Sequence, residues 1–398
     1  MQQPVLLAAT KPRGKGFFFL PNGARGNADL FYMRHALELA QRGAGWTSPN
    51  PAVGAVLVRD DRIVGEGYHQ RAGEAHAEVN ALRQAGGLAR GATLYVTLEP
   101  CSHYGRTPPC TEAVLAAGVR RVVAATADAN PRVRGRGLLR LATSGVAVEV
   151  GLERREARRL NEAFAKYVVT GLPWVSLKMA MSLDGKVATR AGDSRWITGP
   201  TARRAVHELR HRHDAVLVGV GTVLADNPQL TVRWYKGRDP VRVILDSSLR
   251  LPPEARVLKV RSPAPTWVVT TPHHDPNRRR ALEDRGAEVL VVSEAGSRVD
   301  LKALLALLGR RGVTSVLIEG GPTVAAAFLE ADLVDRLYMF VAPKLLGGRE
   351  APGPIGGLGA ERVAQALPVR ELEIRPIGED WLISGYPATK NPEAHWTA

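Results

Sequence analysis

Short apolar segments alternate with helical segments along most of the chain, and this alternation is the strongest constraint on its fold. The pattern runs from about residue 28 to 150 and resumes at 174, after a charged helical stretch at 151–173. Strand–helix alternation is typical of the α/β class, and 398 residues exceed what one core usually holds. The sequence therefore predicts two α/β domains, at 28–150 and 174–387, joined by a connecting helix at 151–173.

The two ends of the chain carry no such pattern. Residues 1–27 contain three prolines and four glycines without sustained periodicity, and are expected to form a disordered extension. Residues 388–398 are expected to form a tail. No apolar run approaches the roughly 20 residues of a membrane helix, and charged residues interrupt the apolar patches near the start. We therefore expect a cytoplasmic protein, in which paired thiols serve more often as ligands or catalysts than as a disulfide.

The formal net charge is +15, which is compatible with nucleic-acid binding. The arginines, however, are scattered and are not interleaved with aromatic residues. A phosphorylated small molecule and a dinucleotide would be favoured by the same charge. We therefore expect a small-molecule substrate, with no nucleic-acid or membrane partner.

The only two cysteines, Cys101 and Cys110, lie in one short loop between a predicted strand and a predicted helix. Upstream, His76 and Glu78 begin another predicted helix. One imidazole and two thiolates supply three protein ligands, which leaves the fourth tetrahedral position of a catalytic zinc open for water. Glu78 is placed to move a proton between that water and a leaving amine. Inert buried thiols or a disulfide are the alternative interpretations.

The order His-x-Glu, strand, Pro-Cys matches the pattern of zinc deaminases. Nucleic-acid deaminases continue with Cys-x-x-Cys, whereas eight residues separate Cys101 from Cys110 here. This spacing argues against an RNA substrate, although an RNA deaminase and a non-catalytic scaffold with a structural zinc remain alternatives. His103 lies between the cysteines and is a second candidate imidazole ligand.

The second half carries weaker signals. Gly219 and Gly221 follow a predicted strand as half of a dinucleotide fingerprint, with Leu224 in place of a third glycine. A second strand ends in Gly320-Gly321, and Pro322 begins a helix, whose backbone N–H groups are suited to a phosphate. An ordinary strand-to-helix turn explains this segment equally well.

The segments "HAEVNAL" and "TLEPCSHYGRTPPC" closely resemble the deaminase half of the bifunctional riboflavin-biosynthesis deaminase–reductase family. "TSPNPAVGAVLV" fits the same half, and "SLKMAMSLDGK", "TVLADNPQLTVR" and "EGGPT" resemble the reductase half. The resemblance covers about residues 28–387. It implies a cytidine-deaminase-like three-layer domain followed by a dihydrofolate-reductase-like domain.

The resemblance also implies the chemistry. Zn²⁺ held by His76, Cys101 and Cys110, with Glu78 as proton shuttle, would deaminate 2,5-diamino-6-(5-phosphoribosylamino)pyrimidin-4(3H)-one. NADPH would then reduce the ribosyl group of 5-amino-6-(5-phosphoribosylamino)uracil to ribityl. The preference for NADPH over NADH is implied by the family and not by any residue of the sequence. A homo-oligomer is expected.

Residue by residue, the family's contacts fall on two sets of positions. Its cofactor contacts correspond to Ala180, Trp196, Thr222, Asp226, Ser247, Gly321, Pro322, Thr323, Val324, Ala325, Ala326 and Ala327. Its substrate contacts in the reductase correspond to Ser194, Arg210, Leu230, Arg233 and Glu319. Asn50 and His69 are candidate pyrimidine contacts of the deaminase, with a turn asparagine and a surface histidine as the alternatives. Candidate proton donors of the reductase are Lys178, Asp184 and Glu319.

Overall fold

The computed structural model describes residues 18–19, 26–104 and 108–396, which form two compact units. The first unit comprises the chain up to Gly43 together with Ala52–Leu160. The second comprises Ala44–Pro51 and Asn161–Ala398. The segment Ala44–Pro51 therefore belongs by its contacts to the second unit, although the sequence places it within the first predicted domain.

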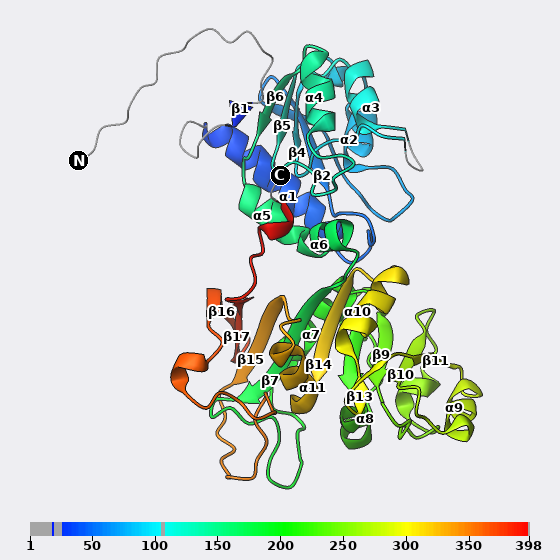
Figure 1. Ribbon diagram of the computed structural model, residues 1–398. Coiled ribbons are helices and arrows are strands. Elements are labelled where there is room, and N and C mark those ends of the chain that lie inside the picture. Colours follow the sequence, from blue (N-terminus) through cyan, green and yellow to red (C-terminus); the bar gives the residue numbers. More distant parts are fainter. Residues whose placement is uncertain (1–17, 20–25, 105–107, 397–398) are drawn as a thin grey trace. The chain divides into compact units, whose positions relative to one another are not determined.

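The first unit is built on a six-stranded sheet in the order β1-β6-β5-β4-β2-β3 (Figure 1). Strand β2 is antiparallel to β3 and β4, and the remaining pairs are parallel. The strands are β1 (Phe18–Phe19), β2 (Gly54–Arg59), β3 (Arg62–Tyr68), β4 (Thr93–Val96), β5 (Arg121–Ala124) and β6 (Ala147–Val150). The helices are α1 (Asn27–Gly43), α2 (Ala77–Ala85), η1 (Gly86–Ala89), α3 (Cys110–Ala116), α4 (Arg136–Thr143) and α5 (Arg154–Leu160).

Helices cover both faces of this sheet. Apolar residues of α1, among them Met33 and Leu37, form a core with Val56 of β2, Val123 of β5 and Ala157 of α5. Helix α2 packs against β3 and also contacts α3, which in turn contacts α4. The result is the helix–sheet–helix sandwich of three layers that was expected for this domain.

Glycines set the distance between α2 and the sheet. A Cβ atom at Gly67 of β3 would lie 2.6 Å from both Ala77 O and Ala81 N of α2. Only a residue without a side chain permits this approach. The close contact fixes the first turn of α2, and with it the position of His76 immediately before the helix.

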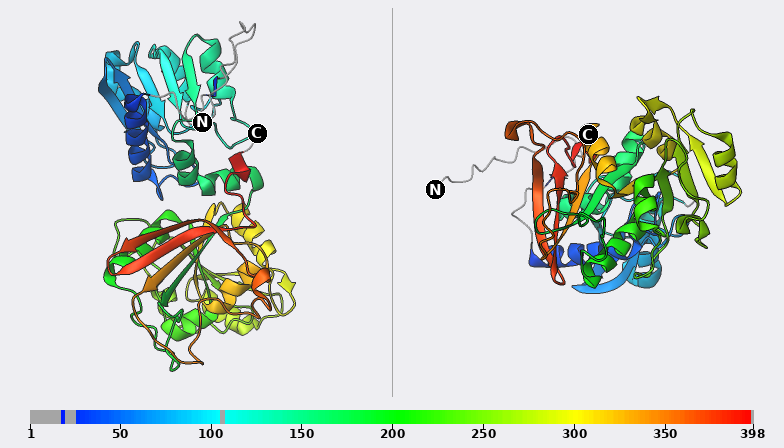
Figure 2. Two further views of the ribbon diagram at one scale, coloured as in Figure 1. Left: turned by 90° about the vertical axis from the view of Figure 1, so that its left-hand side faces the viewer. Right: turned by 90° about the horizontal axis from the view of Figure 1, so that it is seen from below.

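The second unit contains a nine-stranded sheet in the order β11-β10-β9-β8-β14-β7-β15-β17-β16. Strand β17 runs antiparallel to both of its neighbours, and the other pairs are parallel. Figure 2 shows β16 and β17, in orange to red, at one edge of the sheet. The strands are β7 (Trp174–Ser182), β8 (Ala215–Gly219), β9 (Val241–Leu245), β10 (Thr266–Thr270), β11 (Ala287–Val291), β14 (Ser315–Gly320), β15 (Arg336–Ala342), β16 (Val369–Ile377) and β17 (Asp380–Pro387), and a separate hairpin pairs β12 (Glu294–Ala295) with β13 (Arg298–Val299).

Two apolar clusters form the core of this unit. One joins β7, β8 and β14 to α10 and α11, and the other joins β8, β9 and β10 to α8 and α9. The parallel strands β8 and β14 are almost wholly buried, as expected for strands covered on both faces. The helices are α6 (Glu162–Thr170), α7 (Pro200–Arg212), α8 (Val220–Asp226), η2 (Arg256–Lys259), α9 (Pro276–Glu283), α10 (Leu301–Arg310), α11 (Pro322–Glu330), η3 (Val363–Gln365) and η4 (Ala394–Trp396).

The linking and terminal segments differ from the expectations. The predicted connecting helix at 151–173 is two helices, of which α5 belongs to the first unit and α6 to the second. In the expected tail, η4 contacts α6 and Trp396 is buried. In the expected extension at 1–27, Phe18 and Phe19 pair with β6, while residues 1–17 and 20–25 lie outside the described residues. Among the described residues, no helix has the length and apolar character needed to cross a bilayer.

His213, which follows α7, links the helix to the sheet and makes the second unit sensitive to acid. Its Nδ1 donates to Leu209 O (2.7 Å), and its Nε2 accepts from Ser176 Oγ of β7 (2.9 Å). Burial lowers the pKa of His213 to about 4. Since an unfolded histidine titrates near 6.5, the unfolded state binds the extra proton first, and stability falls as the pH drops from about 6.5 to 4. His207 and His211 shift in the same direction because of burial.

We expect His213→Asn to be less stable than the unsubstituted chain at pH 8, because it loses the bond to Ser176. The difference in the free energy of unfolding between the two proteins should be smaller by roughly 2–3 kcal/mol at pH 4.5. At this pH the unsubstituted chain is destabilised because the unfolded state binds a proton at the histidine, and asparagine does not titrate. Denaturant unfolding at both pH values, followed by tryptophan fluorescence, measures this difference. An equal difference at both pH values would contradict the assignment of this acid sensitivity to His213.

Candidate active sites

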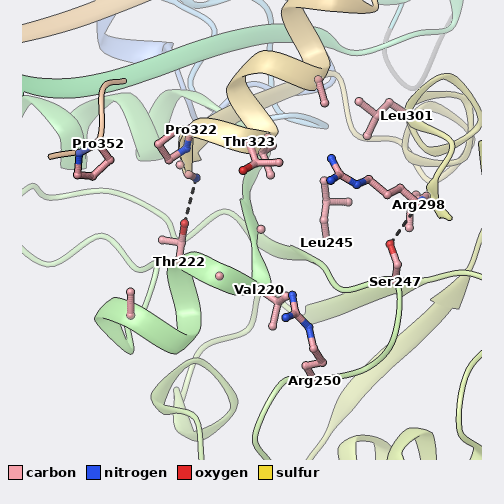
Figure 3. Close-up of a pocket in the computed structure, with 18 of the residues that line it drawn as sticks. Val220, Thr222, Leu245, Ser247, Arg250, Arg298, Leu301, Pro322, Thr323 and Pro352 are labelled. Atoms are coloured by element: carbon pink, nitrogen blue, oxygen red, sulfur yellow. Dashed lines mark hydrogen bonds between the residues drawn. The ribbon is translucent and has the colours of Figure 1, made fainter. Parts of the chain in front are cut away.

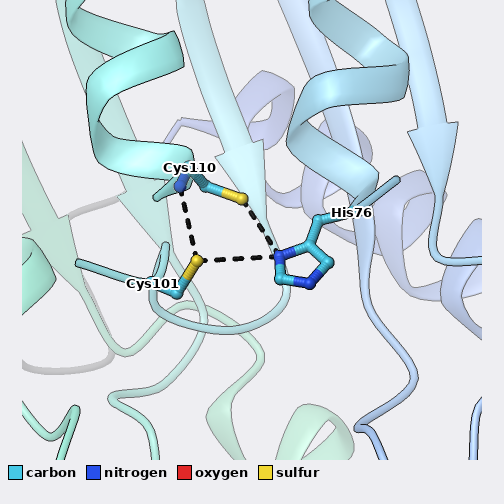
Figure 4. Close-up of side chains that lie close together, drawn as sticks. All are labelled: His76, Cys101 and Cys110. Carbon is cyan, nitrogen blue, oxygen red and sulfur yellow. Dashed lines mark hydrogen bonds between the residues drawn. The ribbon is translucent and has the colours of Figure 1, made fainter. Parts of the chain in front are cut away.

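Three side chains with metal-binding atoms converge in the first unit (Figure 4). His76 precedes α2, Cys101 lies in the loop after β4, and Cys110 is the first residue of α3. Their donor atoms all lie within 4.8 Å of one another, with His76 Nδ1 at 3.2 Å from Cys110 Sγ and 3.6 Å from Cys101 Sγ. One nitrogen and two sulfurs are a donor set suited to zinc, and three protein ligands leave one tetrahedral position for water. The residues that the sequence singles out as ligands are therefore brought together.

The two thiols behave as an acid–base pair. Both cysteines are free, so the disulfide alternative does not describe this structure. Hydrogen bonding from the Cys110 thiol, and then from His76, lowers the pKa of Cys101 to about 4. The same contact raises the pKa of Cys110. The Cys110 backbone N–H also donates to Cys101 Sγ (3.3 Å). A divalent metal binds the thiolate forms, so its binding would release the remaining thiol proton.

Glu78 lies in the first turn of α2 and is 3% exposed. Its carboxyl group is hydrogen-bonded with Cys110 and feels the charges of Cys101 and His76. Burial, followed by the negative charge of Cys101, raises the pKa of Glu78 to about 7. A carboxyl group with this pKa both accepts and releases a proton near neutral pH, as a general acid–base catalyst must.

The other histidines of this unit occupy distinct positions. His103 is exposed and does not join the metal-type cluster formed by the described residues, so the second-ligand alternative is not supported. His69 is buried, which excludes the surface-histidine interpretation, and its ring meets the His76 ring edge-on at 5.3 Å. Its Nδ1 donates to Ala75 O (3.2 Å), and Ala75 directly precedes His76.

Asn50, the other candidate pyrimidine contact, belongs to the second unit, where its backbone N–H donates to Thr47 O (2.8 Å).

Glu99 is a residue of this site that the sequence analysis missed. Its buried carboxylate accepts backbone hydrogen bonds from Asp128 (3.0 Å), Gly135 (2.8 Å), Gly137 (2.8 Å) and Leu138 (3.3 Å). These bonds anchor the chain two residues before Cys101. The sequence does contain a signal for this role, because a glutamate stands directly before Pro-Cys at the end of an apolar strand. A carboxylate at such a buried position needs hydrogen-bond donors around it.

The second unit contains a cavity of ≈ 1220 Å³ where the strands β8, β9 and β14 end (Figure 3). Gly219 and Gly221 line it at the junction of β8 and α8, and Gly320 and Gly321 line it at the junction of β14 and α11. Thr222 Oγ1 accepts a hydrogen bond from Gly321 N (3.0 Å), which ties the two junctions together. Ligands of open α/β sheets bind at such carboxyl ends of strands. The two glycine segments of the sequence thus contribute to one cavity.

Most of the predicted cofactor contacts line this cavity, but not all of them. Trp196 is 61% exposed and packs on the guanidinium of Arg203 (4.3 Å), and Ala325 and Ala326 are buried in α11; none of the three lines the cavity. The predicted cofactor residues that do line it are Ala180, Thr222, Asp226, Ser247, Gly321, Pro322, Thr323, Val324 and Ala327.

The predicted substrate residues form a second group. Arg210 donates to both carboxylate oxygens of Glu319 (2.6 and 2.8 Å) and to Thr231 O (2.9 Å). Arg233 bonds to Thr231 Oγ1 (2.8 Å) and to Gln229, and Leu230 between them is buried with φ 57°. Ser194 instead lines the cavity and donates to Asp226 (3.1 Å). Of the five predicted substrate residues, all of which the structure describes, only Ser194 thus lines the cavity.

The three candidate proton donors differ in charge. Asp184 accepts from Ser182 Oγ and from two backbone N–H groups, which lowers its pKa to about 2 and keeps it ionised. Burial opposes ionisation of Glu319, but Arg210 holds the pKa of Glu319 below its ordinary value. Burial lowers the pKa of Lys178, which faces the same pair. Lys178 is therefore the candidate whose surroundings favour release of a proton.

Comparisons with known proteins identify the family of both halves of the chain. Residues 27–126 match the family model of the cytidine and deoxycytidylate deaminase zinc-binding region, and residues 173–383 match the RibD C-terminal domain. The riboflavin biosynthesis protein RibD of Escherichia coli (strain K12) is 47% identical over 365 residues, which cover 88% of this chain and 97% of that protein. The chain belongs to the RibD family.

Solved structures of RibD proteins share the architecture. Acinetobacter baumannii RibD is 42% identical and gives a TM-score of 0.80, covering 91% of this chain and 99% of that one. A Thermotoga maritima protein, named as a diaminohydroxyphosphoribosylaminopyrimidine deaminase/5-amino-6-(5-phosphoribosylamino)uracil reductase, is 38% identical with a TM-score of 0.78 and the same coverage. The predicted family and the predicted pair of folds are confirmed.

We expect Cys110→Ser to abolish stoichiometric zinc binding, because a serine hydroxyl does not ionise near neutral pH as a thiol beside a metal does. Zinc should fall from about one ion per chain to a small fraction of that after dialysis against a weak chelator. His103→Asn is the matched control and should keep its zinc. Elemental analysis measures the zinc content of both variants. Retention of zinc by Cys110→Ser, or its loss from His103→Asn, would overturn the ligand assignment.

Proposed function

We propose that the chain is a bifunctional enzyme of riboflavin biosynthesis. The first unit deaminates 2,5-diamino-6-(5-phosphoribosylamino)pyrimidin-4(3H)-one, and the second reduces 5-amino-6-(5-phosphoribosylamino)uracil with NADPH. The observation that carries the proposal is the convergence of His76, Cys101 and Cys110 beside the buried carboxyl group of Glu78. Membership of the RibD family, and the two activities named for the Thermotoga maritima relative, support the choice of substrates.

In the deaminase, His76, Cys101 and Cys110 would hold Zn²⁺, which lowers the pKa of a bound water to about 7. Glu78 would accept a proton from the water whose oxygen bonds to the ring carbon, and would deliver it to the amino group as the C–N bond breaks, so that ammonia leaves. The raised pKa of Glu78 suits both transfers. His69, whose ring touches His76 and whose Nδ1 bonds to Ala75 O, holds the segment before the ligand.

In the reductase, NADPH supplies the hydride for C1′ of the open ribosyl imine. The cavity would receive the dinucleotide, and the backbone N–H groups of Gly320-Gly321 and of the first turn of α11 would hold its diphosphate. Arg233, an exposed arginine that bonds to Thr231 and Gln229, would bind the ribose 5-phosphate. Lys178 lies beside Glu319 and Arg210 and donates the proton that completes reduction.

We further propose that the substrates are small molecules only and that the enzyme acts in the cytoplasm without a nucleic-acid or membrane partner. The use of both free thiols as ligands supports a reducing compartment. A homo-oligomer is supported by β16, the last strand of the nine-stranded sheet, which exposes Val369, Leu372 and Ile374. An exposed edge strand that carries these apolar residues among charged ones offers a surface for pairing with a second copy.

We expect Glu78→Gln to separate the two activities. The amide occupies the same volume but carries no transferable proton, so release of ammonia should fall by about 10²–10⁴. Zinc content, and NADPH-dependent reduction of supplied 5-amino-6-(5-phosphoribosylamino)uracil, should be unchanged. Product masses measured with and without NADPH follow both steps, and the unsubstituted enzyme should need only zinc for the first. Ammonia release at the unsubstituted rate would refute the role of Glu78.

We expect Leu372→Glu/Ile374→Glu to convert the oligomer to monomers, because two buried charges would oppose pairing of β16. Light scattering after size-exclusion chromatography measures the mass. Leu358→Glu, which adds a charge at an exposed loop position, is the matched control and should leave the oligomer intact. An unchanged mass for the double variant would place the interface elsewhere.

A further inference from the structure

One end of the cavity in the second unit is rich in cations. Its lining includes Ser247 and Arg250 after β9, Arg298 on β13, and Lys302 in the first turn of α10. Figure 3 shows Ser247 and Arg298 on the side of the cavity away from Thr222 and Pro322. In Figure 3 the guanidinium group of Arg250 lies near Val220, and that of Arg298 extends from a different segment toward Leu245. Segments that are distant in sequence therefore line the same cavity with positive charge.

The carboxylates near this end form hydrogen bonds within the protein. Asp246 directly follows β9, at the place where an acidic residue binds the ribose 2′-hydroxyl in NAD-dependent folds. Here its side chain is buried and accepts from Leu251 N (2.7 Å), and it does not line the cavity. Asp300 accepts from Lys302 N (2.9 Å) and Ala303 N (3.2 Å) and so caps α10. Asp300 also lines the cavity, but it stands against Arg250, Arg298 and Lys302, so the charge of this end is positive.

The two arginines are available to a ligand. Within the part of the chain that the structure describes, neither Arg250 nor Arg298 forms a salt bridge or a side-chain hydrogen bond to a carboxylate. Elsewhere in the same unit arginines near the surface do find such partners, for example Arg279 with Glu283 (2.9 Å). Both side chains are exposed, so they retain their charge and can move onto a bound anion.

The segments that carry the arginines are held in place. Ser247 Oγ accepts from Val299 N (3.3 Å), which ties the β12–β13 hairpin to the end of β9. Thr270 and Thr271 donate to Ser247 O (3.0 and 3.1 Å). Because Ser247 Oγ acts as the acceptor for Val299, its own hydrogen can be donated to a ligand. The arrangement presents one hydroxyl and two guanidinium groups to an anion at this end of the cavity.

We propose that Arg250 and Arg298 bind the 2′-phosphate of the dinucleotide and thereby select NADPH over NADH. The inference rests on the proposed reductase function and adds the residues that determine cofactor specificity. With the diphosphate at Gly320-Gly321, the adenosine half extends toward Ser247, where the extra phosphate meets both guanidinium groups. Arginine is suited to this task because its planar fork pairs with two phosphate oxygens at once.

Isothermal titration of the intact zinc-loaded enzyme with NADPH and with NADH tests this. Arg250→Gln and Arg298→Gln should each weaken NADPH binding by about 10- to 100-fold, as expected for loss of a charge-assisted pair. NADH binding should change by less than about threefold, because that ligand lacks the phosphate. The double variant should bind the two dinucleotides with nearly equal affinity. Arg280→Gln, an exposed arginine on α9 outside the cavity, is the charge-matched control and should behave as the unsubstituted enzyme.

The possible outcomes separate the two levels of the proposal. If the unsubstituted enzyme prefers NADPH and the double variant keeps that preference, the assignment of Arg250 and Arg298 is wrong and the reductase function stands. Equal weakening of NADPH and NADH would also refute selection through the phosphate. If the unsubstituted enzyme binds neither dinucleotide, the reductase function itself fails. Circular dichroism of each variant establishes that it is folded.

Discussion

The direction of the strands determines where both sites lie. In the first unit β3 and β4 are each antiparallel to β2, so they end at the same edge, where the chain continues to His76 and to Cys101. In the second unit the parallel strands β8, β9 and β14 end around one cavity. Polar groups gather at such edges because the strand interiors are covered by helices. Each site is thus a consequence of how its sheet is wound.

How far the sequence predicts a site depends on whether its residues follow local patterns. His76, Glu78, Cys101 and Cys110 occur in short motifs at the starts of helices and the ends of strands, so their convergence could be anticipated. The same holds for Gly320-Gly321 before α11. The pairing of Arg210 with Glu319 joins a helix to a strand more than a hundred residues away, and no local pattern indicates it. Likewise, Ala44–Pro51 joins the second unit only through tertiary contacts.

Part of the basic composition is explained by arginines that form ion pairs with carboxylates of the same unit. Arg121 bonds to Asp29 (2.7 Å) and Glu149 (2.7 Å), and Arg336 bonds to Glu162 (3.1 Å). Such arginines hold elements together and have no need of an external anion. Arg250 and Arg298 differ because the neighbouring acids, Asp246 and Asp300, bond to backbone N–H groups. Net charge alone could not separate these two classes, since only the fold decides which arginine meets a carboxylate.

The two sites bind ligands of opposite charge, a metal cation and an anionic dinucleotide. This difference explains why they are built differently. The first gathers two sulfurs and a carboxyl group in a buried space, where their negative charge is costly until a cation arrives. It is therefore compact, and Gly67 and Glu99 fix the segments that carry it. The second gathers cations and backbone N–H groups around a space large enough for a dinucleotide. Its arginines can remain at the surface, because the ligand brings the compensating charge with it.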